Sequence, residues 1–433
     1  MKQKNRITRR KFLQAAGVTA ASAALAPWNS PARAAVGDAL QATGLSLPCC
    51  IGEVNASGAL VWLRAESESE VAVEYGKDAS FTGAVRSASI RVVADNDYTG
   101  VVQLSGLEPG TTYYCRAAVA NKKVGPSSRF VSAPRADQLA DVRFAFSGDT
   151  RQNFQPFAIM DAIRAKQPDF FLHLGDTIYA DRDGAARDLA QFRQKYVNNR
   201  KDEATQRLFG ETGLYVTWDN HEVAEAERTA NVLAPLGRRA FFDYWPIAPE
   251  LAQAQRVYRS ARWGGLAELF ILDTRQYRDD KAGTILGATQ MRWLLDGIGN
   301  STARFKFVCT SVPFSGPSAD KWGGYPKDRE ALLSAIKEGP IGGVIFLAAD
   351  AHYAAVVRVA GDATLREVIV GPMAAAMGKA TGDVSRFEYY NNRFLNYALA
   401  SVRADGDNAY AEIEILTDKN ILLHKLRIDA GEK

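Results

Sequence analysis

Short apolar runs that end abruptly in polar residues recur along the chain after residue 141. Each run is too short for a globular helix and is typical of a strand that is buried on both faces. Six of these runs are predicted as strands: Val142–Phe146, Phe170–Leu174, Leu214–Trp218, Leu266–Leu272, Phe305–Cys309 and Ile341–Leu347. Pro156–Lys166 has helical spacing between the first two, so these two strands should form a right-handed parallel βαβ unit.

The chain before residue 142 has a different pattern of hydrophobic and polar residues. From about Cys50 to Pro134, short strands alternate with turn signals and show no helical period, which favours a β-sandwich. The Leu-x-Pro-Gly-Thr-x-Tyr-Tyr pattern that begins at Leu107 resembles fibronectin-type-III modules. We therefore predict a structural β-sandwich over residues 45–134, followed by the polar linker Pro134–Asp141.

The last part of the chain returns to strands. Tyr397–Val402, Tyr410–Leu416 and Ile421–Arg427 predict antiparallel pairing, and Asp183–Arg207 reads as a charged helical excursion on the surface. The predicted fold class is a mixed α+β and α/β one: an N-terminal β-sandwich, then a β-sheet core flanked by helices over residues 142–430.

The formal charge of +4 is concentrated at the N-terminus, because the first 34 residues hold seven basic residues and no acidic one. The rest of the chain holds 46 basic and 49 acidic residues, which excludes a nucleic-acid binder by bulk charge. Thr8–Leu13 places paired arginines before Phe-Leu, Ala15–Ala26 is apolar, and Ala32–Ala34 offers a small-x-small cleavage site. This pattern resembles a twin-arginine export signal, with an ordinary basic signal peptide as the alternative.

An export signal implies the twin-arginine translocation machinery as a partner and a periplasmic or extracellular location. No later run reaches the ~18 apolar residues of a spanning helix, so no transmembrane anchor is expected. The four cysteines show neither zinc-ribbon nor disulfide-framework spacing, and Cys115 and Cys309 are expected in the core. His173 is expected to be a hydrogen-bonded core histidine, and His424 a peripheral one.

Four of the predicted strand endings carry residue types that bind metal ions. They are Asp149, Asp176 with Tyr179, Asn220 with His221, and Asp350 with His352. A single aspartate after a strand is usually a cap or a turn, but four endings on one sheet edge indicate a site. Oxygen-rich ligands with few imidazoles suit Ca²⁺, Mn²⁺ or Fe³⁺. A central carboxylate, best placed at Asp176, could bridge two ions ~3.5–4 Å apart, which is the geometry used for displacement at phosphorus.

The order of the motifs carries a resemblance. Gly-Asp-x-x-Tyr, Trp-Asp-Asn-His-Glu, Leu-Asp-Thr-Arg-Gln-Tyr-Arg and Asp-x-His resemble the PhoD-type alkaline phosphatase and phosphodiesterase family of the metallophosphoesterases. The sandwich is similar to the module that precedes that family's catalytic domain. The resemblance implies a phosphoric ester hydrolase that cleaves phosphomonoesters, phosphodiesters or both by attack of a metal-activated hydroxide.

The resemblance also implies a ligand set. Asp176 would bridge two ions, with Tyr179 and His352 on the first ion and Asn220 and Asp350 on the second. The family typically pairs Fe³⁺ with Ca²⁺. His221 would stand beside the substrate phosphate as a proton donor or charge stabiliser, oriented by a neighbouring carboxylate such as Asp219 or Glu222.

Two positions depart from the family pattern. Asp149 takes the place of a cysteine ligand, and the loss of the soft sulfur favours Mn²⁺ or Ca²⁺. Thr310 and Ser311 stand where the family often has an asparagine, which weakens the second ion's coordination or leaves the position to water. Arg151 could clamp a phosphate oxygen or be a surface arginine. Arg275 could reach the site, although an internal salt bridge is its commoner fate.

Two alternatives stay open at this point. A phospholipase-like phosphodiesterase would be favoured by an apolar groove beside the metal ions. A catalytically degenerate relative would act through its sandwich as a binding module. The joint presence of the predicted ligands with His221 argues against decay of the site, whereas the substrate stays undetermined.

Overall fold

The computed structural model describes residues 40, 42–224, 232–359, 364–382, 384–406 and 408–431. The predicted export signal, residues 1–34, lies outside these ranges. No helix within them is both long and apolar enough to cross a membrane. Leu40–Lys433 groups into one unit, and the description below concerns this unit alone.

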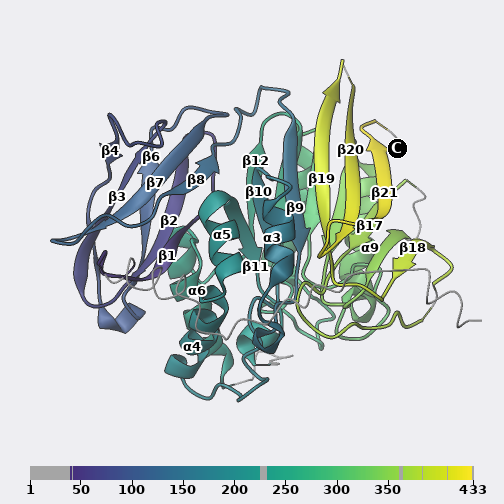
Figure 1. The fold of residues 1–433 in the computed structure, drawn as a ribbon. Helices are drawn as coiled ribbons and strands as arrows, with labels where there is room; N and C mark the ends of the chain where they lie inside the picture. Colours follow the sequence, from purple (N-terminus) through teal and green to yellow (C-terminus); the bar gives the residue numbers. More distant parts are fainter. Residues whose placement is uncertain are drawn as a thin grey trace, which may run out of the picture. The chain divides into compact units, whose positions relative to one another are not determined.

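The larger of two long sheets has nine strands in the order β21-β20-β19-β9-β10-β11-β1-β2-β6 (Figure 1). Its strands are β1 (Leu45–Gly52), β2 (Gly58–Ala65), β6 (Thr99–Ser105), β9 (Val142–Ser147), β10 (Phe170–Leu174), β11 (Gly213–Thr217), β19 (Asn396–Asp405), β20 (Asn408–Thr417) and β21 (Leu422–Asp429). Strands β9, β10 and β11 run parallel, and α3 (Ala158–Arg164) connects the first two. The predicted antiparallel strands at the end of the chain are confirmed as β19–β21.

The second sheet has seven strands in the order β12-β13-β14-β15-β17-β16-β18. Its strands are β12 (Arg259–Trp263), β13 (Ala267–Ile271), β14 (Phe305–Cys309), β15 (Val344–Ala348), β16 (Ala354–Arg358), β17 (Arg366–Ile369) and β18 (Phe387–Asn391). Strands β13, β14 and β15 run parallel. The prediction of one shared sheet edge is therefore wrong, because the six apolar strands divide three and three between two sheets.

The two sheets nevertheless bring their carboxyl-terminal edges together. The hydroxyl of Thr217, at the end of β11, donates to the carbonyl of Leu272 beyond β13, over 2.7 Å. One residue further on, Trp218 Nε1 donates to Asp273 Oδ1 over 2.8 Å. A strand buried on both faces carries the same apolar pattern in either sheet, so the pattern could not reveal the division.

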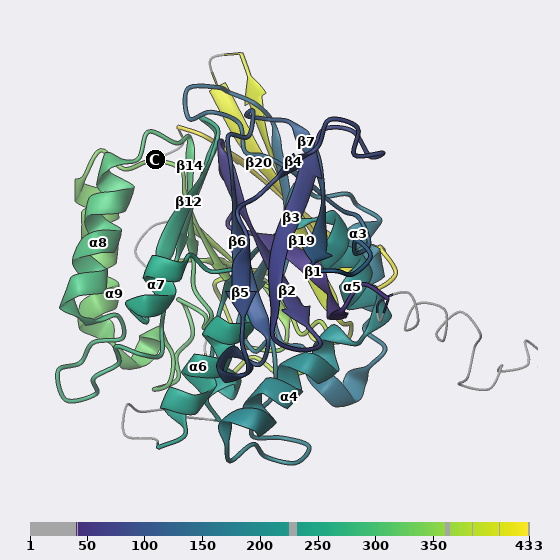
Figure 2. The same ribbon diagram turned by 90° about the vertical axis from the view of Figure 1, so that its left-hand side faces the viewer.

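Helices cover the outer faces of both sheets (Figures 1 and 2). Side chains of α3, α4 (Leu189–Arg200), α5 (Glu203–Glu211) and α6 (Ala234–Tyr244) join one apolar cluster with strands of the larger sheet. Side chains of α8 (Gly287–Asn300) and α9 (Pro326–Glu338) join another with β13, β14 and β15. The short α7 (Pro249–Gln253) precedes β12. The predicted helical excursion over Asp183–Arg207 consists of two helices, because the side chains of Asp188 and Asp202 each accept from a backbone N–H and begin a new helix.

The N-terminal strands form the predicted β-sandwich. Strands β3 (Ser69–Gly76), β4 (Val85–Arg86), β5 (Ile90–Val92), β7 (Thr112–Val119) and β8 (Ser128–Val131) make a third sheet. Its apolar side chains share a cluster with those of β1, β2 and β6. Strand β1 also pairs in parallel with β11, Gly52 opposite Leu214, so the sandwich and the core share a sheet. The predicted fold class is confirmed, whereas the boundaries 45–134 and 142–430 stay predictions.

Aromatic side chains fill the space between the two long sheets. Phe144 of β9 stacks on Phe170 of β10, with ring centroids 4.8 Å apart, and meets the edge of Phe307 of β14 at 5.0 Å. All three side chains are buried, and they belong to the cluster that joins both sheets. All four cysteines are free and buried, as expected for Cys115 and Cys309. This packing fixes the distance between the two edges that carry the polar strand endings.

Truncating Phe144 tests that packing. Phe144→Ala should lower the free energy of unfolding by about 3–5 kcal/mol, because the large buried ring leaves a cavity between two sheets. Phe154→Ala is the matched control, since the Phe154 side chain is exposed. Urea unfolding followed by tryptophan fluorescence measures both variants. A loss below about 1 kcal/mol for Phe144→Ala would contradict this description of the core.

Candidate metal centre

Four aspartates lie just beyond the ends of parallel strands. Asp149 follows β9, Asp176 follows β10, Asp219 follows β11 and Asp350 follows β15. Three of them have left-handed backbone conformations, with φ of +68° for Asp149, +53° for Asp176 and +61° for Asp350. Aspartate tolerates this conformation better than most residues, at a modest cost in strain. The backbone therefore turns sharply where each strand stops and directs these carboxylates to one place.

Glycine is required at one of these turns. Gly175 has φ +102°, and a Cβ there would lie 2.9 Å from Asp219 Cβ and 3.0 Å from the carbonyl carbon of Trp218. The missing side chain allows the turns after β10 and β11 to touch. Asp176 and Asp219 are thereby brought together.

The first cluster consists of Asp149, Asp176 and His352, whose ligand atoms lie within 4.8 Å of one another. Both carboxylate oxygens of Asp149 are buried and have no hydrogen-bond partner. His352 Nε2 lies 3.5 Å from Asp149 Oδ1 and 3.1 Å from the hydroxyl of Tyr179. The carbonyl of Ala376 accepts from His352 Nδ1 at 2.6 Å, which leaves Nε2 facing the cluster. These four predicted residues are thus brought together.

The second cluster shares Asp176 and adds Asp219 and Asp350, again within 4.8 Å. Sequence reasoning considered Asp219 only as a support for His221 and missed it as a candidate ligand. Asp219 also forms a buried ion pair with Arg275. Arg275 therefore does reach the site, through the salt bridge that was its expected alternative. The predicted ligand Asn220 lies at the rim of this pair, where its Oδ1 accepts from Arg275 Nη2 at 3.4 Å.

His221 stands beside both clusters. Its Nε2 lies 3.8 Å from Asp176 Oδ2, and its ring stacks on Tyr179 with centroids 4.0 Å apart. Its Nδ1 lies 2.5 Å from Asp181 Oδ1. A carboxylate does orient His221, as expected, but it is Asp181 and neither of the two suggested residues, Asp219 and Glu222. The motif signal for Asp181 was weak, because it stands 40 residues before His221 in a separate loop.

Glu222 has a different task. Its buried carboxylate accepts from the backbone N–H groups of Asp176 at 3.2 Å and Asp219 at 2.8 Å, and from the Thr177 hydroxyl at 2.7 Å. It therefore ties the turns after β10 and β11 to each other. Burial is the main cause that raises the pKa of Glu222 to about 7.

Arg151 makes a bidentate ion pair instead of pointing freely into the site. Its Nε and Nη2 donate to the two carboxylate oxygens of Asp183 over 2.9 and 2.7 Å. The role of Arg151 as a phosphate clamp stays a prediction, and a phosphate would have to compete with Asp183.

Thr310 and Ser311 do not leave a gap beside the second cluster. Ser311 donates to Asp219 Oδ1 over 3.0 Å, and the Thr310 hydroxyl accepts from Trp322 Nε1 over 3.0 Å. The loop that follows places Lys321 on Asp350, where the ammonium forms an ion pair with Oδ2. Lys321 was missed because a lysine in a Ser-, Gly- and Pro-rich loop is usually at the surface.

Like charges dominate the electrostatics of the two clusters. Burial, followed by the charges of Asp219, Glu222 and Asp149, raises the pKa of Asp176 well above its usual range. Burial and the charges of Asp176 and Asp149 likewise raise the pKa of Tyr179. Carboxylates that are buried and unpaired are costly, and a bound cation removes that cost. The residues present therefore fit metal ions: Asp149 supplies oxygens without partners, and the donors are the carboxylate, phenol and imidazole groups that hard cations accept.

The remaining histidines lie apart from these clusters. His173 is buried in β10, and its Nε2 lies 3.1 Å from the Thr150 hydroxyl, which confirms a hydrogen-bonded core residue. His424 of β21 stacks on Tyr389 with ring centroids 4.5 Å apart.

Two solved structures share this fold. "Structure of PhoD" superposes with a TM-score of 0.78 at 19% identity, covering 90% of this chain and 94% of the other. A purple acid phosphatase from yellow lupin (Lupinus luteus) seeds superposes with a TM-score of 0.67 at 13% identity, covering 88% and 73%. The fold is therefore that of known phosphatases.

The sequence comparisons identify the family. Residues 144–400 match the family model of the PhoD-like phosphatases. Residues 32–134 match the model of the N-terminal domain of PhoD-like phosphatases. "Alkaline phosphatase D" of Bacillus subtilis (strain 168) is 26% identical over an alignment of 425 positions, and the match covers 81% of this chain and 72% of that protein. This chain belongs to the PhoD-like phosphatase family and is a phosphoric ester hydrolase.

The buried histidine beneath the site generates a pH prediction. Burial lowers the pKa of His173 from its ordinary 6.5 to about 3, so above pH 3 the folded protein keeps it neutral while the unfolded chain protonates it below 6.5. Its stabilising contribution is complete above pH 6.5 and is lost as the pH falls towards 3, at about 1.4 kcal/mol per pH unit. Between about pH 6 and 4.5, the unfolding free energy of His173→Gln should fall less steeply with decreasing pH than that of wild type. The slopes should differ by up to about 1.4 kcal/mol per pH unit, which corresponds to one proton. Urea unfolding across this range measures the difference, and parallel curves would contradict it.

Proposed function

We propose that this chain is an exported, metal-dependent phosphohydrolase that cleaves phosphomonoesters, phosphodiesters or both. The observation that carries the proposal is Asp149, whose two buried oxygens have no partner and face Asp176 and His352. A second carboxylate cluster shares Asp176, so two ions could be held side by side.

Each ion has its own candidate ligands. Asp149, Tyr179 and His352 would hold the first, Asp219 and Asp350 the second, and Asp176 would bridge them. Asn220 is a further candidate ligand at the edge of the second ion's cluster. The family resemblance suggests Fe³⁺ with Ca²⁺, whereas a carboxylate at residue 149 in place of a thiolate favours Mn²⁺ or Ca²⁺. Bound cations supply Lewis acidity and neutralise charge on a phosphoryl group.

The protein's own residues handle the proton. Asp181 accepts from Nδ1 of His221, which fixes the tautomer and leaves Nε2 directed at the clusters. Tyr179 stacks on the ring and holds its plane. With Nδ1–H held by Asp181, His221 carries a proton at Nε2 only as the imidazolium. Transfer of that proton to the oxygen of a leaving group leaves a neutral imidazole that still donates from Nδ1 to Asp181, which makes His221 the general acid. Arg151 is proposed to bind a phosphate oxygen when it exchanges Asp183 for the substrate.

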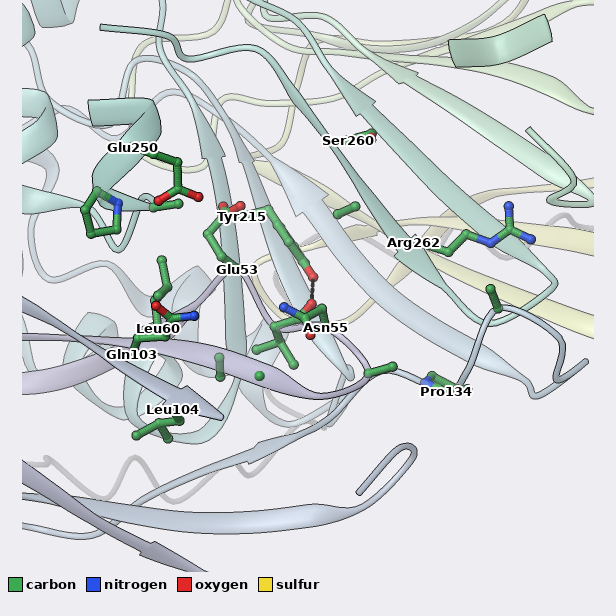
Figure 3. Close-up of a pocket in the computed structure, with 18 residues that line it drawn as sticks. Glu53, Asn55, Leu60, Gln103, Leu104, Pro134, Tyr215, Glu250, Ser260 and Arg262 are labelled. Carbon is green, nitrogen blue, oxygen red and sulfur yellow. Dashed lines mark hydrogen bonds between the residues drawn. The ribbon is translucent and has the colours of Figure 1, made fainter. Parts of the chain in front are cut away.

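A cavity of about 430 Å³ lies elsewhere on the molecule (Figure 3). Its lining includes Glu53, Tyr215, Glu250 and Arg262 but none of the cluster residues. This cavity therefore gives no support to the phospholipase-like alternative, which needs an apolar groove beside the metal ions.

Export is proposed from the sequence alone. The twin-arginine pattern in residues 1–34 supports passage through the twin-arginine machinery to the periplasm or beyond. The direct test of the whole function is hydrolysis of an aryl phosphate monoester and diester by the purified protein, with and without chelator. Activity that a chelator removes and added Mn²⁺ or Ca²⁺ restores would support the proposal, and chelator-resistant activity would contradict it.

His221→Ala should lower the hydrolysis rate by ~10²–10⁴-fold with the metal content unchanged, because only the proton donor is removed. Asp181→Asn should lower it by about 10- to 100-fold, since the amide no longer fixes the imidazole. Steady-state rates and elemental analysis of the same samples provide the test. Loss of metal in His221→Ala would instead make His221 a ligand.

Asp149→Asn should bind one ion fewer and should lose most of the thermal stabilisation that wild type gains from Mn²⁺. In metal-free protein the same change should raise the unfolding free energy by about 1–3 kcal/mol, because one buried carboxylate without partners is gone. Asp137→Asn is the control, since the Asp137 side chain is 68% exposed. A metal-free Asp149→Asn protein that is less stable than wild type would contradict this reading.

A further inference from the structure

The two carboxylate clusters differ in the positive charge around them. In the described part of the chain, no lysine or arginine forms an ion pair with Asp149 or Asp176. In the second cluster, by contrast, Arg275 pairs with Asp219 and Lys321 pairs with Asp350. The second cluster therefore already holds two cationic groups before any metal ion binds.

The structure holds Lys321 in this position. The next residue, Trp322, is fully buried, and its Nε1 donates to the Thr310 hydroxyl over 3.0 Å. Its ring packs on that of Phe314, with the ring centroids 4.9 Å apart. A Cβ at Gly316 would lie 2.8 Å from Lys321 Cδ, so the lysine stem passes close over the backbone of Gly316. The side chains of Lys321 and Asp350 are 17% and 13% exposed. Lys321 is therefore a built part of the centre.

The two cationic groups are not equivalent. Arg275 is buried, and its backbone N–H donates to Asp273 Oδ1 over 3.0 Å. Its guanidinium group donates to Asp219 and to Asn220. Lys321 carries a compact ammonium on a flexible four-carbon stem and keeps some contact with solvent. A second carboxylate, Asp320 Oδ2, lies 3.8 Å from its ammonium. Lys321 can therefore leave Asp350 and keep a partner, whereas Arg275 cannot move without uncovering Asp219.

We propose that Lys321 is a displaceable internal counter-ion that occupies the second metal position on Asp350. This inference rests on the proposed metal-dependent function. Lys321 must swing from Asp350 towards Asp320 before a second cation binds, so part of that cation's binding free energy goes into the displacement. Among the described residues, no lysine or arginine competes in this way at the first cluster. The two positions should therefore differ in affinity, with the ion at Asp149 and His352 tight and the ion at Asp350 exchangeable.

The test is a Mn²⁺ titration of the full-length, chelator-stripped protein, with free Mn²⁺ read by electron paramagnetic resonance. Wild type should bind one ion tightly and a second more weakly. Lys321→Met should tighten the second ion by about tenfold or more and leave the first within about twofold, because one competing unit charge has been removed. Lys327→Met is the control, since it removes the same charge from an exposed position of α9.

A measurement on wild type covers the case in which Lys321→Met does not fold. Brief acetylation with acetic anhydride, read by peptide mass spectrometry, reports how accessible each lysine is. Lys321 should be protected in metal-free protein and react several-fold faster when Mn²⁺ is saturating, while Lys327 reacts equally in both. Equal protection of Lys321 in the two states would overturn the inference.

The outcomes separate the two proposals. If wild type binds two Mn²⁺ ions and Lys321→Met binds the second ion with unchanged affinity, the counter-ion role of Lys321 is overturned. The proposed metal site is then still supported. Loss of the second ion in Lys321→Met, but not in Lys327→Met, shows that Lys321 organises the ligands and also overturns it. No Mn²⁺ bound in wild type overturns the metal-dependent function itself.

Discussion

Repulsion between buried carboxylates is the constraint on which the rest of this structure depends. Asp149, Asp176, Asp219 and Asp350 lie within two overlapping clusters and are almost entirely shielded from water, apart from Asp350. Such an arrangement is unfavourable unless positive charge enters it. Arg275 and Lys321 compensate one cluster, whereas in the described part of the chain only the histidines His352 and His221 lie at ion-pair distance from Asp149 and Asp176 of the other. The fold maintains this arrangement through its backbone, and Glu222 ties two of the turns together.

Two sheets, each with four neighbouring parallel strands, make the arrangement possible. Each sheet ends in polar turns, and the aromatic packing around Phe144 and Phe307 sets how far apart those turns lie. Asp149, Asp176 and Asp219 come from one sheet, while Asp350 and His352 come from the other. The two clusters therefore lie where the two sheets meet. The strand ends and the tight turns that follow them determine the spacing of these side chains.

Much of this could be predicted from the sequence. The apolar runs at Phe170–Leu174 and Leu214–Trp218 indicated buried strands because their length and pattern admit little else. The chemistry of the turns followed, since aspartate and histidine repeated at strand ends. The division of the strands between two sheets could not be predicted, because each apolar run has the same pattern whichever sheet buries it. The joining of β1 to β11 escaped detection for the same reason.

Partners across the site were the hardest part to predict. Asp181 orients His221 from 40 residues away, and Lys321 reaches Asp350 from a loop with no helical or strand pattern. Asp219 was noticed beside His221, yet its place in the second cluster depends on the contact of two turns at Gly175. Contacts between distant segments leave no trace in local spacing. Motifs therefore revealed which chemistry is present, and only the fold revealed which side chain supports which.

The central claim is that the two carboxylate clusters bind two metal ions that share Asp176. The most direct measurement is an anomalous difference map from crystals of the purified protein equilibrated with Mn²⁺. Our account predicts two peaks about 3.5–4 Å apart on either side of Asp176, one beside Asp149 and His352 and the other beside Asp219 and Asp350. A map without a peak at Asp176, or with Mn²⁺ bound only elsewhere on the surface, would contradict it.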